Sequence, residues 1–171
     1  VKAAIDAALK AHKMWSTMPW ESRCAIFLKA SELLAGPRRA EINASTMLNQ
    51  SKTCHQAEID SACELIDFWR FNSDYCRQIY EDLQPPVSPS SMWNSSEVRP
   101  LEGFVFSVTP FNFSSIAANL PSSAAIMGNT GVWKPSRNSY VSNYRLMRLM
   151  MDAGLPAVSY THLRAHETGY N

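Results

Sequence analysis

Residues 101–136 read LEGFVFSVTPFNFSSIAANLPSSAAIMGNTGVWKPS, and this stretch predicts a strand, a sharp turn, a helix and a second strand. Gly103–Thr109 is almost continuously apolar, as expected for a strand buried on both faces of a parallel sheet. Pro110 ends this strand because proline has no N–H to donate to a neighbouring strand. Ser114–Met127 is rich in alanine and serine, which suits a helix packed closely against a sheet, and Gly128-Asn129 ends it. The predicted fold class is therefore α/β.

Two polar residues follow or end the predicted strands. Asn112 comes just after the first strand, and Lys134 ends the second strand, which includes Val132 and Trp133. Ligands of open α/β sheets bind at the carboxyl ends of the strands, so Asn112 is a candidate ligand-binding residue. The sequence leaves two alternatives open, because an asparagine after a strand often caps a turn and a terminal lysine often faces solvent.

The composition limits the class of protein. The chain has 171 residues, 46% hydrophobic and 18% charged, which is typical of a globular domain with its own core. A net charge of +1 argues against a nucleic-acid partner, and no apolar run reaches the roughly 20 residues of a membrane span. The sequence begins without methionine inside a helical pattern, so we expect an internal piece of a longer chain.

The cysteines form neither a C-x-x-C pair nor a zinc pattern, so we expect buried free thiols in a reducing compartment and no metal site, with a disulfide or a metal site as the alternative. The four cysteines are Cys24, Cys54, Cys63 and Cys76.

Residues 1–81 show the periodicity of amphipathic helices. Helices are expected over 1–15, from about Pro19 to Gly36, over 38–49 and over 57–80. The apolar and aromatic side chains expected to face inward include Leu48, Ile59, Phe68, Trp69, Phe71 and Tyr75. The acidic residues Glu64 and Asp67 of the last helix could form a solvated face.

The remaining segments differ in character. Residues 82–100 contain three prolines, which exclude a helix and leave either a surface linker or a short exposed strand over 91–98. A helix over 140–152 should turn Tyr144, Met147 and Met151 to one face. Val158–Asn171 has no periodicity, and its SYTHLRAHET resembles the translation of a sequencing adapter. We interpret 158–171 as an artefactual tail that does not pack against the body.

TPFNF followed by GNTGVWKPS resembles the aldehyde dehydrogenase superfamily, whose members carry P-x-N-F and, some twenty residues later, G-N-x-x-x-x-K-P. Upstream, FLKASELLAGPRRAEI and QAEIDSACELIDFWRFN resemble one branch, the 1-pyrroline-5-carboxylate (glutamate semialdehyde) dehydrogenases. The resemblance covers about residues 1–157 and implies an amino-terminal fragment. It implies a helical segment over 1–81, a linker or oligomerisation strand over 82–100, and the first β-α-β-α part of an incomplete Rossmann-like NAD-binding domain over 101–157.

The resemblance implies that an aldehyde is oxidised to an acid through attack by a cysteine thiolate, with NAD as cofactor. Asn112 matches the asparagine that stabilises the oxyanion, a role that suits a neutral amide with two donor hydrogens. The residues that match the cofactor site are Thr109, Pro110, Phe111, Lys134 and Ser136. Glu64 and Phe113 match residues that line the substrate site, although Phe113 could instead be a core residue.

The resemblance also implies properties of the whole enzyme. Its substrate would be the aldehyde glutamate semialdehyde, which it would convert to glutamate in proline catabolism. It would be a homo-oligomer, located in the mitochondrial matrix in a eukaryote and in the cytoplasm otherwise. None of the cysteines matches the nucleophile, so the chain alone should be inactive. Two residues depart from the family pattern. Gly131 weakens the second strand, and Arg137 replaces an acidic residue, which leaves NADP as an alternative cofactor. The alternative functions are an aldehyde dehydrogenase of another substrate class and a non-enzymatic helical interaction module.

Overall fold

The computed structural model of the chain describes residues 1–156 and 160–162. Its main elements are helices α1 (Lys2–Trp15), α2 (Trp20–Ala35), α3 (Arg39–Gln50), α4 (Cys54–Ala57), α5 (Glu64–Arg77), α6 (Ser114–Ile126) and α7 (Tyr140–Ala153), and strands β1 (Val105–Val108), β2 (Gly131–Lys134) and β3 (Tyr160–His162). Three shorter helical segments complete the described part: the π-helical η1 (Glu58–Cys63) and η2 (Gln78–Asp82) and the 3₁₀ turn η3 (Arg137–Ser139).

The strands form one parallel sheet in the order β1-β2-β3. Val105 pairs with Gly131, and Gly131 pairs with Tyr160. Helix α6 connects β1 to β2 and α7 connects β2 to β3, which is the arrangement that parallel strands require. The α/β class expected from the sequence is confirmed.

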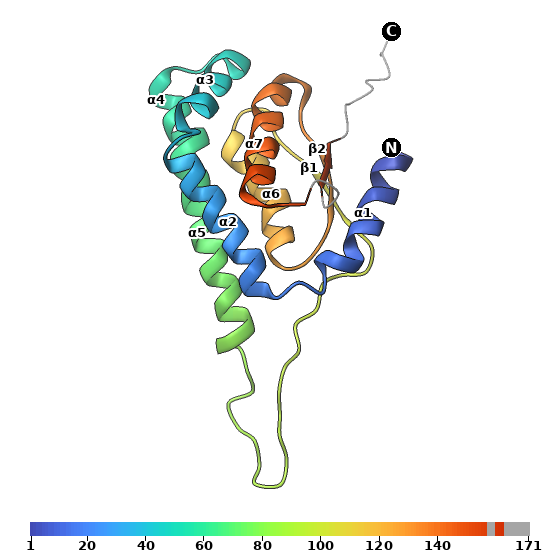
Figure 1. The fold of residues 1–171 in the computed structure, drawn as a ribbon. Coiled ribbons are helices and arrows are strands. Elements are labelled where there is room, and N and C mark those ends of the chain that lie inside the picture. Colours follow the sequence, from blue (N-terminus) through green and yellow to red (C-terminus); the bar gives the residue numbers. More distant parts are fainter. Residues whose placement is uncertain (157–159, 163–171) are drawn as a thin grey trace.

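Helices cover both faces of the sheet (Figure 1). Helices α6 and α7 lie on one face, and α1 packs against β2 and β3 from the other. Successive residues of β2 point to opposite faces, as in any strand. Trp133 is fully buried in the larger core with α6 and α7, whereas Val132 packs against Ala4 and Ala8 of α1.

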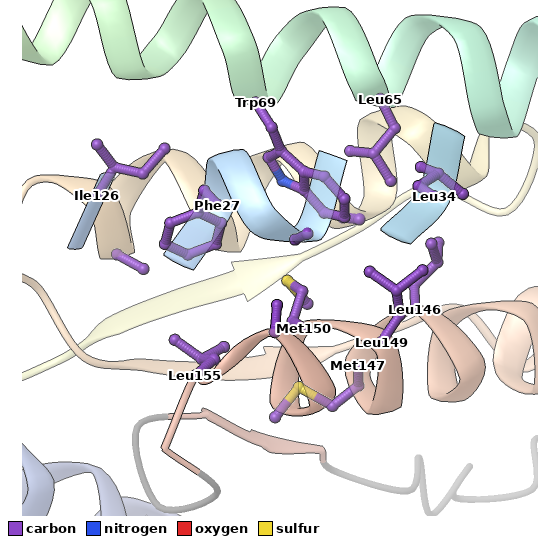
Figure 2. Packing of buried hydrophobic residues seen from close by; sticks show 14 of the residues in the cluster. Phe27, Leu34, Leu65, Trp69, Ile126, Leu146, Met147, Leu149, Met150 and Leu155 are labelled. Atoms are coloured by element: carbon purple, nitrogen blue, oxygen red, sulfur yellow. The ribbon is translucent and has the colours of Figure 1, made fainter. Parts of the chain in front are cut away.

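The larger core lies between α2, α5, α6 and α7 (Figure 2). Phe27 of α2 and Trp69 of α5 meet at a ring-centroid distance of 6.4 Å, and both are fully buried. Trp69 Nε1 donates a hydrogen bond to Ser122 Oγ of α6 at 2.9 Å, so its one polar group is satisfied. Alanines such as Ala117 and Ala118 are fully buried on α6 and allow α5 to approach closely, as the composition of this helix predicts.

One long helical stretch runs from Cys54 to Asp82 through α4, η1, α5 and η2. The sequence predicts a start near residue 57, but Thr53 begins the helix earlier with a reciprocal cap. Gln56 N donates to Thr53 Oγ1 at 3.2 Å, and Thr53 N donates to Gln56 Oε1 at 3.0 Å. The T-x-x-Q pattern of such a capping box is visible in the sequence.

Several side chains expected inside are exposed. They are Leu48 at 87%, Ile59 at 42%, Phe71 at 58% and Tyr75 at 54%. The expectation for Phe71 and Tyr75 rests on the aromatic density of this helix and not on its period. The apolar stripe through Ile66, Trp69 and Cys76 is buried as predicted, whereas Phe71 and Tyr75 lie two and six residues after Trp69, on the other side of α5. Of the four aromatic residues predicted, only Trp69 is fully buried.

Strand β1 is covered on one face only, which corrects the expectation of burial on both. Ser107 is buried, whereas Phe106 and Val108 are each 54% exposed. Phe106 pairs with Val132 and so shares its face of the sheet. Helix α1 covers that face over β2 and β3 but does not extend across β1.

The segment between η2 and β1 extends away from the body (Figure 1). We call Leu83–Arg99 the excursion. Every residue of this segment is described and none forms a strand within this chain, and an oligomerisation strand in 82–100 stays a prediction. Ser96 N donates to Gln84 Oε1 at 2.9 Å and Asn94 N donates to Ser88 Oγ at 2.9 Å, so hydrogen bonds hold the two limbs of the excursion together.

Within 158–171, the structure describes Tyr160–His162 as β3, paired with β2. The expectation that this tail does not pair with the body is therefore wrong for these three residues. The remainder of the predicted tail lies outside the described residues, and its origin as an artefact stays a prediction.

Candidate functional site

The carboxyl ends of β1 and β2 are joined at one edge of the sheet. Thr109 N donates to the Lys134 carbonyl oxygen at 3.2 Å, which continues the strand pairing one residue beyond β1. Trp133 Nε1 donates to Thr109 Oγ1 at 2.9 Å, and both residues are buried. This pair of bonds fixes the point at which the chain leaves the sheet.

The turn Pro110–Phe113 leads directly from this point into α6. Phe111 is 57% exposed and Asn112 is exposed as well. Phe113 precedes the first turn of α6 in extended conformation and supplies no side-chain cap. Among the described residues, the Asn112 side-chain amide makes no hydrogen bond, so it does not cap the turn as the alternative interpretation of the sequence supposed. The amide is therefore available to a ligand.

A lysine that the sequence analysis missed anchors this turn. Lys52 follows α3, and its ammonium donates to the main-chain carbonyl of Asn112 and to the carboxylate of Asp60. The ammonium also lies over the Phe113 ring, 4.4 Å from its centroid. The side chains of Lys52 and Asp60 are only 13% and 16% exposed. No local pattern identifies Lys52, because its partners lie on η1 and on the turn before α6.

Glu64 is held at the same end of α6. Ser115 Oγ donates to Glu64 Oε2 at 2.6 Å, and Glu64 is half-buried, whereas Asp67 is exposed. The solvated-face interpretation therefore applies to Asp67 and not to Glu64. Glu64 directly follows the π-helical η1, and such π segments are frequent at functional sites.

Polar side chains from α3 fix the beginnings of α6 and α7. Gln50 Nε2 donates to Ser114 Oγ at 2.6 Å and to Ser142 Oγ at 3.1 Å. Asn49 Oδ1 accepts from the backbone N–H groups of Val141 and Ser142 at 3.0 and 3.2 Å, which caps the first turn of α7. The two helices that flank β2 are thus held at their amino-terminal ends, next to the strand ends.

The sequence-predicted residues meet at this one end of the fold. Lys134 and Ser136 are half-buried beside Thr109, and Arg137 is exposed at the start of η3. The turn residues 110–113 lie between this strand edge and Glu64 on α5. The structure thus brings all eight predicted site residues to one region, and the roles that the resemblance gives them stay predictions.

Near Lys52 and Asp60, the Glu58 carboxylate of η1 binds two side chains of α3. Glu58 accepts hydrogen bonds from the Arg39 guanidinium, at 2.8 Å from Nε, and from the Asn43 amide. The Arg39 guanidinium lowers the pKa of the Glu58 carboxyl below its ordinary value, against the opposing effect of burial. This ionised contact fixes the segment from which Asp60 reaches Lys52.

Two further features hold for residues 1–156 and 160–162. No group of three histidine, cysteine, aspartate or glutamate side chains is placed to hold a metal ion. In the same residues, no helix has the length and apolar character needed to span a membrane.

Comparison with known proteins places this geometry in a family. The sequence model of the aldehyde dehydrogenase family matches residues 1–169. A delta-1-pyrroline-5-carboxylate dehydrogenase of Agaricus bisporus is 49% identical over 156 residues, which are 91% of this chain and 28% of that protein. The mitochondrial delta-1-pyrroline-5-carboxylate dehydrogenase of Homo sapiens is 50% identical and is matched over 90% of this chain and 27% of its own length.

A solved structure agrees with the sequence comparison. The delta-pyrroline-5-carboxylate dehydrogenase of Mycobacterium tuberculosis, crystallised with NAD bound, is 50% identical and superimposes with a TM-score of 0.94. The match covers 96% of this chain and 30% of that one, so the chain spans less than a third of the length of these relatives. The described fold corresponds to the amino-terminal part of an aldehyde dehydrogenase, helical with a small parallel sheet. With helices, sheet and strand-end turn in agreement over almost its whole length, this chain belongs to the aldehyde dehydrogenase family.

Proposed function

We propose that this chain forms part of the active site of an NAD-dependent dehydrogenase that oxidises L-glutamate 5-semialdehyde to glutamate. The observation that carries the proposal is the exposed amide of Asn112, which has no hydrogen-bond partner among the described residues and lies at the carboxyl end of β1. The names of the most similar relatives support the choice of substrate, since the proteins of Agaricus bisporus and Homo sapiens are delta-1-pyrroline-5-carboxylate dehydrogenases.

Asn112 is proposed to stabilise the oxyanion that forms when a thiolate attacks the aldehyde carbon. Its amide is neutral and carries two donor hydrogens, so it can donate to the negative charge that develops in the transition state. The Lys52 ammonium donates to the main-chain carbonyl of Asn112, and Trp133 Nε1 donates to the Thr109 hydroxyl at the start of the turn. The donor is therefore positioned by two contacts that do not involve its own side chain.

The carboxyl ends of β1 and β2 suit a bound nicotinamide dinucleotide. When bound, this cofactor would accept the hydride from the aldehyde. Lys134 and Ser136 offer an ammonium and a hydroxyl at the end of β2, where hydroxyl groups of a ribose can be bonded. The exposed ring of Phe111 and the backbone of Thr109-Pro110 offer an apolar surface along which the cofactor would lie. NAD bound to the Mycobacterium tuberculosis relative supports this cofactor over NADP.

Glu64 and Phe113 are proposed to line the substrate site. The glutamate semialdehyde carries an ammonium group that a carboxylate can bind, and Glu64 is held close to the turn by Ser115. Phe113 has Lys52 against its ring, so the ring is supported by a charged contact as well as by packing.

We further propose that the whole protein is a homo-oligomer acting on this small-molecule aldehyde, and that it works in the mitochondrial matrix if its source is eukaryotic. The mitochondrial relatives of Homo sapiens and Dictyostelium discoideum support the location.

The experiment joins this chain to the carboxyl-terminal part of a related delta-1-pyrroline-5-carboxylate dehydrogenase and measures NAD reduction. The chimera should oxidise glutamate semialdehyde with a higher kcat/KM than an aldehyde without amino and carboxylate groups, and the isolated chain should show no turnover because it lacks the matching nucleophile. If the chimera prefers the plain aldehyde, glutamate semialdehyde is not the substrate. If the isolated chain shows turnover, the proposal that it lacks part of the active site is wrong.

A further inference from the structure

Two cysteines of the helical core face each other at a distance from the proposed active site. Cys24 lies on α2 and Cys76 on α5, both are buried where these two helices pack together, and the two thiols interact electrostatically. The Cys24 thiol also donates to the Ser73 carbonyl at 3.8 Å, and the Cys76 thiol donates to the Ile126 carbonyl at 4.0 Å. Because Ile126 is the last residue of α6 and the site lies at its first residue, the thiol pair is at the opposite end of that helix.

A buried arginine accompanies the pair. Arg23 is 2% exposed, and its guanidinium donates to the Ile126 carbonyl at 2.9 Å and to the Tyr80 hydroxyl at 3.0 Å. No carboxylate of the described residues forms an ion pair with Arg23, so its positive charge is not neutralised directly. A thiolate formed beside it would be stabilised by that charge.

The two thiols are not equivalent. The interaction with the Cys76 thiol lowers the pKa of Cys24, and the nearby Arg23 charge adds to this effect against burial. The same interaction, together with burial, raises the pKa of Cys76. Cys24, which also lines a surface pocket, is therefore the thiol that loses its proton more readily.

Solvent reaches Cys24 although only 5% of the residue is exposed. A surface pocket of about 390 Å³ between α2 and α5 has Cys24 in its wall, together with Trp20 and Ser73. A small neutral molecule can enter such a pocket, whereas Cys76 is 1% exposed and does not line it.

We propose that Cys24 and Cys76 form a reversible oxidation site that a hydroperoxide converts to a disulfide linking α2 and α5. The Cys24 thiolate attacks one peroxide oxygen, the O–O bond breaks, and the departing hydroxide takes up the proton that Cys24 lost, which yields water and a Cys24 sulfenic acid. The Cys76 sulfur then attacks the Cys24 sulfur, the S–O bond breaks, and hydroxide leaves as water with the Cys76 proton. Two thiols lose two electrons in total, and one peroxide is reduced to two waters.

The test exposes the folded chain to hydrogen peroxide, blocks the remaining thiols with an alkylating reagent and maps the peptides by mass spectrometry. We expect a cross-linked peptide pair that contains Cys24 and Cys76, the loss of two alkylatable thiols, and recovery of both after dithiothreitol. Cys63 is the matched control, because its thiol also lies near a guanidinium, that of Arg39, but no second thiol is among the groups that interact with it. The exposed Cys54 controls for simple accessibility.

The variants Cys54→Ala and Cys63→Ala should keep the cross-link, whereas Cys24→Ala and Cys76→Ala should lose it. If a core variant fails to fold, the peptide map of the unaltered chain still decides, since it needs no substitution. The proposal is overturned if Cys54 or Cys63 is oxidised while Cys24 and Cys76 stay alkylatable, or if the same cross-link forms as fast in urea-unfolded chain as in folded chain.

Discussion

The turn Pro110–Phe113 and the excursion Leu83–Arg99 have similar ingredients but are held differently. Each contains proline, asparagine and an exposed aromatic ring. The turn is tied to other elements, by Lys52 from the end of α3 and by the bonds of Thr109 to β2. The excursion is tied mainly to itself, and its Trp93 is 87% exposed. Side chains placed by contacts from several elements can be held in one geometry, which is what a binding or catalytic site requires.

The largest effect should come from the side chain that the turn presents. In the chimera, Asn112→Ala should lower kcat on the order of 10²–10³-fold, because an oxyanion donor acts only after thiolate attack. Lys134→Ala should instead raise the KM for the cofactor and spare kcat. The measurement is a saturation series in each substrate, and Asn94→Ala in the excursion is the control that should change neither constant. A near-normal kcat of Asn112→Ala under chemistry-limited conditions would exclude the oxyanion role.

Removing the anchor of the turn should cost stability. Lys52→Met leaves Asp60 as an unpaired and mostly buried carboxylate, so the free energy of unfolding should fall by about 2 kcal/mol. The matched control is Lys2→Met, since the Lys2–Asp6 pair is exposed and should contribute less than about 0.5 kcal/mol. Urea unfolding curves of both variants measure the difference, and equal losses would show that Lys52 does not anchor the turn.

The bond between the two strand ends should contribute less. A double-mutant cycle of Trp133→Phe and Thr109→Val should give a coupling energy of about 1 kcal/mol, which is typical of a buried neutral hydrogen bond. The cycle separates the bond from the volume that each substitution removes. Strictly additive losses in unfolding free energy would mean that packing alone holds Thr109.

The carboxylate behind the anchor should show its contribution through pH. The pKa of Glu58 is lower in the native state than in the unfolded state, so the ionised carboxylate stabilises the fold. This contribution to the free energy of unfolding is complete above the ordinary carboxyl pKa of about 4.3. It is lost as the pH falls through the lower native pKa. Glu58→Gln should therefore cost about 1 kcal/mol near neutral pH and progressively less in acid. Stability measured from pH 7 downward tests this, with the exposed Glu81→Gln as control. If the loss in unfolding free energy does not change with pH, the effect of Glu58→Gln comes from altered packing and not from the lost charge.

The smallest effect is expected at the tip of the excursion. Trp93→Ser removes a side chain that is 87% exposed, so the free energy of unfolding should stay within about 0.5 kcal/mol of that of the unaltered chain. A larger loss would show that Trp93 packs against the body, and the contrast between excursion and turn would then be weaker than the contacts suggest.

Prediction from sequence worked best where a local pattern carries its own physical cause. The apolar run of β1, Pro110 after it and the small residues of α6 specify strand, turn and helix without reference to distant residues. The T-x-x-Q cap at Thr53 was equally local and could have been found. The π-helical η1 could not, because nothing in a 3.6-residue period announces an inserted residue. Phe71 and Tyr75 are exposed because they lie off the apolar stripe of α5, so aromatic density alone does not predict burial.

The sequence by itself determined the α/β class, the order of helices and strands, and the position of Asn112 just beyond the end of a strand. Only the tertiary structure decided that Lys52 anchors the turn, that Glu64 meets Ser115, and that Cys24 meets Cys76. The physical reason is the range of the interactions. Strand, turn and helix preferences act between neighbours in the chain, whereas these three contacts join side chains that become neighbours only after the helices have packed.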